Sequence, residues 1–290
     1  MMRTEQEMFD LILNFANADD NIRVVLLNGS RANPNAAKDP FQDFDIACIV
    51  RDVTPYWNNP QIPAAFGEMM ILQTPEDMGD PAPDSDGHYT YLMQFMDGNR
   101  IDLSFDPFEI MAQVLKDSLT VVLLDKDGCL PQLPPASEDS YLPKPPTAKQ
   151  FADCCNEFWW LNPYVAKALW RGEITLAKRI LDGYMRDQMQ KMLTWYFGIH
   201  TDFTKAPGKQ GGNIKNFIEP SLWLDYMQTF PDAQTEHIWD ALLCMDKLFH
   251  ELGQDVTRHF GYPYPLQEDK NVSSFIRHIR TLPLDAKKIY

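Results

Sequence analysis

The spacing of apolar residues over the first 130 positions is typical of strands. Apolar runs bounded by polar or small residues predict strands at residues 24–27, 45–50, 69–72, 89–96 and 120–124. Residues 100–105 alternate strictly between polar and apolar, and the preceding Asp97-Gly98 is typical of a hairpin turn. Residues 5–18 show helical spacing instead, so a sheet preceded by one helix is expected.

The pattern changes after a stiff, proline-rich segment. Six prolines lie between residues 131 and 146, and we place a domain boundary there, at 135/136. Beyond it, a period of about 3.6 predicts helices at 147–160, from Asn162-Pro163 onward, and at 174–197, 221–230, 233–260 and 267–282. The predicted fold class is α/β (α+β): a mixed-sheet domain at 1–135, an all-helical domain at 136–290, and a cleft between them.

One further helix is predicted to start at Asp106-Pro107. Asp106 fits the cap position, Pro107 the first helical position, and Glu109 completes a capping box in which Asp replaces the usual Ser or Thr. On this interpretation Asp106 caps a helix and takes no part in chemistry.

Composition excludes several classes of protein. The 290-residue chain is 44% hydrophobic and 12% aromatic, which is enough for a globular core. It has no apolar run long enough to cross a membrane, and its first residues lack the apolar core of a signal peptide. The five cysteines show no zinc-site spacing, so we expect a reduced, cytoplasmic protein. The oligomeric state is open, with a monomer favoured.

The net charge of −15 is concentrated in the first half of the chain. Residues 1–146 hold 24 acidic and 9 basic residues, whereas residues 147–290 hold 17 of each. Such a field repels a nucleic-acid backbone, which proteins usually bind with a basic surface, and it attracts cations. The charge therefore disfavours a nucleic-acid partner and favours a small cationic one.

The candidate catalytic residues lie at the ends of the first two predicted strands, next to the loop that connects them. Gly29-Ser30 ends the first strand, and Asp43 and Asp45 open the second, with both carboxylates on one face because residues i and i+2 share a face. Asp102 lies on the polar side of the alternating strand, with Arg100, and joins these acids if the two strands are neighbours. Carboxylates this close repel one another without a cation, and oxygen ligands suit a hard ion such as Mg²⁺.

These features together resemble a known superfamily. A Gly-Ser turn, a spaced Asp-x-Asp and a later Asp on an alternating strand are similar to the nucleotidyltransferases with a polymerase-beta-like core. Over about residues 5–280 the chain further resembles the aminoglycoside 6-adenylyltransferases, which modify streptomycin. The segments that carry this likeness are Gly29-Ser30-Arg31-Ala32-Asn33, Asp43-Phe44-Asp45-Ile46, Glu157-Phe158-Trp159-Trp160 and Tyr164-Val165-Ala166-Lys167.

The resemblance implies Mg²⁺-dependent transfer of AMP from ATP at a two-metal site, with pyrophosphate leaving. Asp43 and Asp45 would hold the metal bound to the triphosphate. Asp102 would hold the second metal, accept the proton of the acceptor hydroxyl, or both. Gly29 would let the backbone approach the phosphates, and Ser30 would donate a hydrogen bond to a phosphate oxygen.

Three basic residues are candidates for further contacts with the nucleotide. Arg31 follows the Gly-Ser turn, and Lys209 and Lys215 belong to a glycine-rich loop at 205–215 that lacks the spacing of a Walker motif. For each of them, a solvated position on a surface loop is an equally good interpretation.

The resemblance also implies an aminoglycoside acceptor, with streptomycin and its 6-hydroxyl favoured. Cationic sugars suit carboxylates and aromatic faces. The candidate acceptor residues are Glu157, Trp159, Trp160, Tyr164 and Asp182. The alternative for at least one of the two tryptophans is a place in the core, and for Asp182 it is a solvated charge.

Other functions remain open on the same fold. The acceptor could be another antibiotic or a protein hydroxyl, although the large helical domain counts against the latter. A non-catalytic nucleotide-binding regulatory protein is a further alternative, but it would not need three converging carboxylates. An RNA-binding module is disfavoured by charge.

Overall fold

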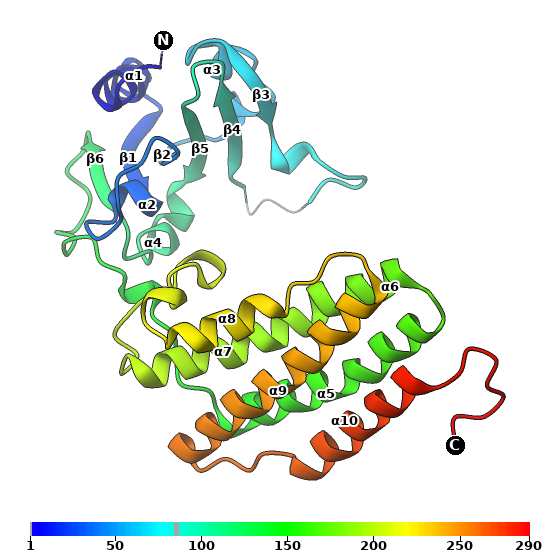
Figure 1. Cartoon of the computed structure of the whole chain (residues 1–290). Coiled ribbons are helices and arrows are strands. Elements are labelled where there is room, and N and C mark those ends of the chain that lie inside the picture. The colour runs from blue at the N-terminus through cyan, green and yellow to red at the C-terminus, as the bar shows by residue number, and fades with distance from the viewer. Residues whose placement is uncertain (1, 84–86) are drawn as a thin grey trace. The chain divides into compact units, whose positions relative to one another are not determined.

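In the computed structural model, which describes residues 2–83 and 87–290, the first unit of the chain (Met1–Ser140) is built on one six-stranded sheet. Its strands are β1 (Ile22–Asn28), β2 (Phe44–Val50), β3 (Met69–Gln73), β4 (Tyr89–Phe95), β5 (Arg100–Pro107) and β6 (Val121–Asp125). They lie in the order β3-β4-β5-β2-β1-β6, with β3 and β6 at the edges (Figure 1). The β2–β5 pair is parallel and the other four pairs are antiparallel, so the predicted mixed sheet is confirmed.

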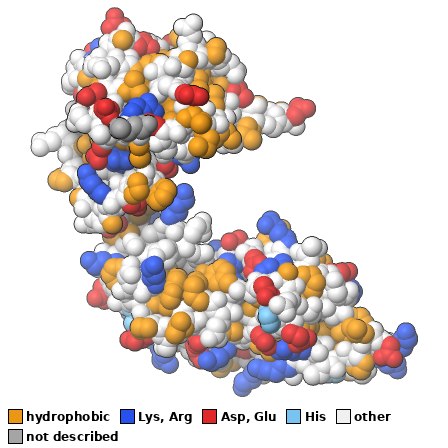
Figure 2. All heavy atoms as spheres, turned by 45° about the horizontal axis from the view of Figure 1, so that its top comes forward, with side chains coloured by type: hydrophobic (Ala, Val, Ile, Leu, Met, Phe, Trp, Pro, Cys, Tyr) orange, Lys and Arg blue, Asp and Glu red, His pale blue; other side chains and the backbone are white. Residues whose placement is uncertain are grey.

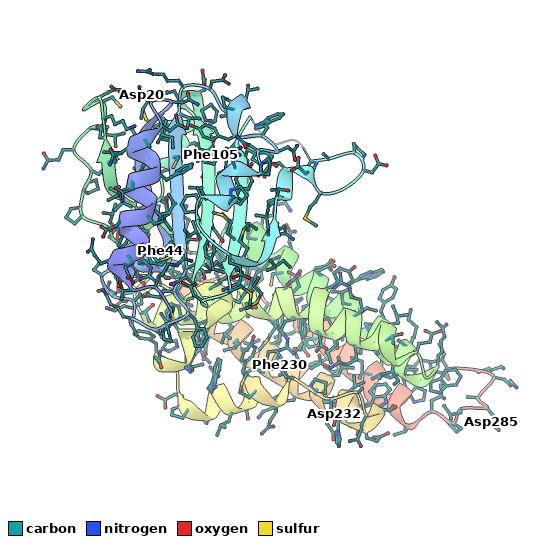
Figure 3. The ribbon with its side chains drawn as sticks, turned by 90° about the horizontal axis from the view of Figure 1, so that it is seen from above. Asp20, Phe44, Phe105, Phe230, Asp232 and Asp285 are labelled. Atoms are coloured by element: carbon teal, nitrogen blue, oxygen red, sulfur yellow. The ribbon has the colours of Figure 1, made fainter. Side chains whose placement is uncertain are left out.

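Helix α1 (Glu5–Ala18) packs on one face of this sheet, as its spacing predicted. A capping box fixes its start: Glu7 N donates to Thr4 Oγ1 at 3.3 Å, and Thr4 N donates to Glu7 Oε2 at 2.7 Å. The buried side of α1 joins one core cluster with the inward-facing residues of the strands. Phe44 of β2 and Phe105 of β5, both labelled in Figure 3, belong to that cluster.

The opposite face of the sheet is apolar at one end and polar at the other. At the apolar end, residues of β1 and β2 pack against η3 (Phe108–Ile110) and α4 (Met111–Val114). Because side chains alternate along a strand, Asp45 shares its face with the covered Ala47 and Ile49. The short helices α2 (Gly29–Ala32) and α3 (Gln61–Ala64) interrupt the loops of this unit.

The predicted helix start at Asp106 is wrong. Strand β5 continues to Pro107 in register with β2, so that Asp106 pairs with Ile49. The buried Asp106 carboxylate accepts a hydrogen bond from Ser104 Oγ at 2.5 Å, and the cap of η3 is Pro107. Burial raises the pKa of Asp106. Pairing with β2 therefore outweighs the short capping pattern, which took account of local sequence alone.

The second unit (Tyr141–Tyr290) is a bundle of helices (Figure 1). Its main elements are α5 (Ala148–Trp170), α6 (Ile174–Arg179), the π-helical η5 (Ile180–Met185), α7 (Arg186–His200), α8 (Pro220–Gln228), α9 (Thr235–Phe260) and α10 (Leu266–Thr281). The predicted helices at 221–230, 233–260 and 267–282 are confirmed within one or two residues at each end. Within the described ranges, no helix has both the length and the apolar character needed to cross a membrane.

Two helix predictions need correction. The helices predicted at 147–160 and from Asn162-Pro163 are one continuous helix, α5, with Pro163 inside it. Pro163 has no N–H for the carbonyl of Trp159, so one helical hydrogen bond is missing at this turn. The buried Asn162 Nδ2 donates an additional hydrogen bond to the Phe158 carbonyl at 3.1 Å. The long helix predicted from residue 174 is interrupted by the π-helical turn η5, which local spacing does not reveal.

A carboxyl group lies unpaired in the core of the second unit. Asp246 of α9 is 5% exposed, and neither of its oxygens, nor Oδ1 of Asn162, has a hydrogen-bond partner among the described residues. Burial raises the pKa of Asp246 well above its ordinary value. A protonated Asp246 would supply the donor that these buried oxygens lack.

We therefore predict that Asp246→Asn stabilises the second unit at neutral and alkaline pH. A carboxyl with a raised pKa contributes its full stability below the pKa of the unfolded chain and loses it as pH rises through the folded pKa. The amide keeps a donor without ionising, so the gain should be small near about pH 4 and reach about 1–2 kcal/mol near about pH 8. Urea unfolding across that range measures it. The exposed Asp285→Asn is the control, and an equal effect of both variants would contradict the prediction.

Candidate active site

A tight turn carries β1 into α2 and brings its backbone against the second strand. Gly29, the first residue of α2, has a φ of +72°, which residues with a side chain rarely adopt. A Cβ on Gly29 would lie 3.0 Å from Asp45 Cγ and closer still to Asp45 Oδ2. Glycine is therefore required because the carboxylate occupies that space. Ser30 follows in the same turn with an exposed side chain.

The parallel pairing of β2 with β5 brings the predicted carboxylates together. Asp45 is the register partner of Asp102. Two residues earlier on each chain segment, Asp43 Oδ2 lies 3.6 Å from Arg100 Nε. All four side chains project from one face, because residues i and i+2 of a strand share a face. The predicted adjacency of the two strands is confirmed, and the chemistry assigned to the acids stays a prediction.

Arg100 is a residue of this cluster that the sequence interpretation left without a role. Its Nε and Nη2 donate to the two carboxylate oxygens of Asp102 at 2.7 and 2.8 Å, which is a bidentate pair. These hydrogen bonds raise the pKa of the Arg100 guanidinium, and the charges of Asp43 and Asp45 act in the same direction. The strict alternation of residues 100–105 had already placed Arg100 on the side of Asp102, so the signal was present in the sequence.

Arg31 fixes the loop that leads to the acids. Its Nη2 donates to the Gln42 carbonyl at 2.6 Å and its Nε to the Asp43 carbonyl at 3.2 Å. The guanidinium lies 3.8 Å from the centre of the Phe44 ring, and Nη1 lies 3.3 Å from Glu5 Oε2. Burial lowers the pKa of Arg31. The side chain thus positions Asp43 here, and a contact with phosphate would require these bonds to break.

The cluster fits a divalent cation in donor type. Carboxylate oxygens are the ligands that Mg²⁺ prefers, and the absence of a side chain at Gly29 makes room for the Asp45 carboxylate. In the part of the chain that the structure describes, no three carboxylate, imidazole or thiol groups converge on one point as ion ligands. The guanidinium of Arg100 contacts Asp43 and Asp102 where an ion would bind.

The second unit carries an open groove of 730 Å³ that contains Glu157. Asp153, Lys191 and Trp195 also line it, so charges of both signs and an aromatic face are available to a polar ligand. An adjoining groove of 400 Å³ shares Lys191 and Trp195 with the first and includes Gln210 of the glycine-rich loop. Sequence reasoning identified Glu157 but missed Asp153, which lies four residues earlier on the same helix. It also missed Trp195 of α7, which only the packing of α5 beside α7 brings close.

The aromatic candidates separate into a buried and an exposed group. Trp159 is 2% exposed and its Nε1 donates to Tyr264 Oη at 3.2 Å, so it is a core residue, the alternative left open for one of the two tryptophans. Trp160 is 63% exposed, and its ring lies 6.4 Å from that of the half-exposed Tyr164. Lys167 Nζ lies 4.3 Å from the centre of the Tyr164 ring. Trp160 and Tyr164 are therefore accessible, but neither lines the groove of Glu157.

The remaining candidates lie elsewhere on the second unit. Asp182, in the π-helical turn, forms an ion pair with Lys178, with 2.8 Å between Asp182 Oδ2 and Lys178 Nζ. The same Nζ donates to the Pro231 carbonyl at 2.6 Å. Lys209 and Lys215 lie in the short turns η6 (Lys209–Gly211) and η7 (Ile214–Asn216), and both are exposed. Asp182 thus has a structural partner, whereas the two lysines are open to solvent.

Comparison with known proteins identifies the family. The sequence model of the family described as streptomycin adenylyltransferase matches residues 2–279. An aminoglycoside 6-adenylyltransferase from Campylobacter jejuni is 37% identical over 276 residues, which cover 95% of either chain. One from Bacillus subtilis (strain 168) is 34% identical over 280 residues, 96% of this chain and 98% of the relative. The chain belongs to the streptomycin adenylyltransferase family.

Membership of the streptomycin adenylyltransferase family confirms the resemblance seen in the sequence and the predicted enzyme class, an adenylyltransferase. A crystal structure of an aminoglycoside 6-adenyltransferase from Bacillus subtilis is 31% identical and aligns over 97% of this chain and 100% of that chain, with a TM-score of 0.47. The match to the family model, over residues 2–279, extends through both units of the chain.

The close approach of Gly29 to Asp45 generates a prediction. In Gly29→Ala the methyl group should force the Asp45 carboxylate to rotate away, so adenylyl transfer should fall at least tenfold. The left-handed φ should also destabilise the protein by about 1–2 kcal/mol. Gly128→Ala is the matched control, because Gly128 has a φ of +61° and open space around a Cβ. Turnover and urea unfolding of both variants separate the effects: similar stability losses with equal activities would refute the role given to this contact.

Proposed function

We propose that the protein transfers AMP from ATP to a hydroxyl of an aminoglycoside, with the 6-hydroxyl of streptomycin as the favoured acceptor. The observation that carries the proposal is the set of Asp43, Asp45 and Asp102 on two neighbouring parallel strands and the loop before one of them, with Asp45 against the Gly29 turn, in a member of this family. The names of the relatives, aminoglycoside 6-adenylyltransferases, support the acceptor class and the hydroxyl.

The residues divide the reaction between them. The acceptor oxygen attacks the α-phosphorus of ATP, the bond to the bridging oxygen breaks, and pyrophosphate leaves. Asp43 and Asp45 would hold Mg²⁺ on the triphosphate, and Asp102 would accept the hydroxyl proton, hold a second ion, or both. When bound, Mg²⁺ neutralises charge on the phosphates. Gly29 and Ser30 would border the phosphates, and backbone can approach them at Gly29 because it has no side chain.

We assign the acceptor to the groove of Glu157. Its carboxylates can bind guanidinium or ammonium groups, its amides can bind hydroxyls, and Trp195 offers a ring face. Figure 2 shows acidic and basic side chains interspersed over the visible face of this unit, in line with its balanced charge. Attraction of a cation to this unit must therefore come from particular carboxylates such as Glu157. Lys209 and Lys215 remain candidates for the nucleotide phosphates.

The proposal is tested with labelled ATP, Mg²⁺ and a panel of aminoglycosides. The expected result is an AMP adduct of streptomycin, with pyrophosphate released in equal amount. Label on another aminoglycoside alone would change the acceptor, and label on protein would replace it with a protein hydroxyl. Binding of ATP with no transfer to any acceptor would favour the non-catalytic nucleotide-binding alternative and overturn the proposal.

The paired acids generate a specific prediction. Asp43→Asn or Asp45→Asn should reduce transfer by at least about a hundredfold, roughly 3 kcal/mol in the barrier. Neither should lower the melting temperature, because removing one of several clustered carboxylates also removes repulsion. Turnover assays and thermal unfolding in the absence of metal measure both effects. Near-normal turnover in either variant would refute the metal-binding role assigned to that residue.

The groove generates a second prediction. A charge-assisted hydrogen bond contributes about 1.5–3 kcal/mol, so Glu157→Gln should raise the KM for streptomycin at least tenfold, a change of about 1.4 kcal/mol, and leave the KM for ATP unchanged. The wild-type acceptor KM should also rise with salt. Glu251→Gln, an exposed change of equal charge in the same unit and outside the groove, is the control. If neither Glu157→Gln nor added salt changes the KM for streptomycin, binding of the acceptor by this carboxylate is excluded.

A further inference from the structure

A single guanidinium is surrounded by the three acids of the candidate active site. Arg100 bonds both oxygens of Asp102, at 2.7 and 2.8 Å, and its Nε lies 3.6 Å from Asp43. Asp45 is the register partner of Asp102, and its negative charge helps to raise the pKa of Arg100. The four side chains together carry a net charge of −2, with the one positive charge placed where it opposes the repulsion among the acids.

The same geometry hinders Asp102 in the roles that the proposed function gives it. Both carboxylate oxygens of Asp102 accept hydrogen bonds from Arg100, so neither oxygen is fully available to a metal ion or to the proton of an acceptor. A divalent cation beside Asp43 and Asp45 would also repel the guanidinium at this short range. Arg100 in this position and a bound metal therefore compete for Asp102.

We propose that Arg100 is a positioning residue that holds the acids in the nucleotide-free protein and exchanges partners when the metal and nucleotide bind. Asp43, Asp45 and Asp102 would then hold the metal, and the guanidinium would turn to the phosphates, which it can bind with the same bidentate geometry. Metal binding is thereby coupled to nucleotide binding, because a metal ion alone must displace Arg100 without offering it a new partner. This inference rests on the proposed function, since it assumes a metal and a nucleotide at these acids.

Exposure and local contacts make this exchange feasible. The side chains of Arg100, Asp43 and Asp102 are 39%, 37% and 23% exposed, so water and ions reach the pair. Arg31 differs, because its side chain is only 10% exposed and is bonded to backbone carbonyls under the Phe44 ring. Of these two arginines, Arg100 is the one that can move without breaking the loop.

The first test measures metal binding without nucleotide. In Arg100→Met the three acids lose their resident cation, so Mn²⁺, followed by its electron paramagnetic resonance signal, should bind at least tenfold more tightly, or about 1.4 kcal/mol. Arg23→Met is the matched control. Arg23 makes a bidentate pair with Asp127 in the same unit, so its loss changes the unit's charge equally and leaves the acids alone. Unchanged Mn²⁺ affinity in Arg100→Met, or an equal gain in Arg23→Met, would overturn the inference.

The second test measures the nucleotide. Affinity for a non-hydrolysable ATP analogue with Mg²⁺ should fall at least tenfold in Arg100→Met, opposite in direction to the change for the metal alone. Arg100→Lys keeps the positive charge but not the bidentate guanidinium, so the changes in Mn²⁺ affinity and in nucleotide affinity should both be smaller. The same two measurements are made on this variant if Arg100→Met does not fold. A purely structural arginine would weaken both ligands together, and that result would exclude the exchange.

These outcomes separate the inference from the function beneath it. If the wild-type protein binds no Mn²⁺ even with the ATP analogue, the proposed function fails. If it binds Mn²⁺ with the analogue, but Arg100→Met shifts neither affinity, only the role of Arg100 fails.

Discussion

The parallel pairing of β2 with β5 is the constraint on which the candidate site depends. In a sheet whose other pairs are antiparallel, this pair starts both strands at the same edge, so that Asp45 is opposite Asp102 and Asp43 lies close to Arg100. A shift of one residue would turn Asp102 to the opposite face, into the core that contains Phe105. The apolar residues that alternate with the acids therefore fix the register, and the register fixes the chemistry.

This arrangement leaves the sheet with a local conflict that the fold only partly resolves. Like charges on neighbouring strands destabilise a pair, and here three carboxylates share one face. The compensation comes from Arg100, whose bonds to Asp102 are short, while Asp45 is held against the backbone of Gly29. To bind an ion tightly in the absence of nucleotide, the site would need carboxylates that are not paired with Arg100. The contacts that stabilise the ligand-free protein therefore oppose metal binding at the same atoms.

The sequence predicts those features that follow from local periodicity. Prediction from the sequence fails where contacts between residues distant in sequence determine the local structure. The strands and the candidate acids follow from alternation and turn residues, since a strand needs little else to be recognised. Asp106 looked like a helix cap until β2 extended β5 past it, and Pro163 looked like a helix start until the packing of α5 carried the helix through. Trp159 and Trp160 are adjacent, and contacts with Phe249 and Tyr264, far along the chain, place Trp159 in the core.

The two arginines near the acids show why residue type alone does not assign a role. Arg31, beside the Gly-Ser turn, was a candidate for a phosphate contact, with a solvated loop position as the alternative. Its Nε and Nη2 bond the Asp43 and Gln42 carbonyls, and its guanidinium lies over Phe44. The carbonyls and the ring are partners that no ligand replaces, and the remaining Nη1 lies 3.3 Å from the Glu5 carboxylate, so Arg31 is held against the loop that carries Asp43. The partner of Arg100 is a carboxylate, which a metal ion can take over, and a guanidinium released in this way can bind a phosphate equally well. What distinguishes a structural arginine from one that can exchange ligands is therefore the chemistry of its present partners, and that is visible only once the chain is folded.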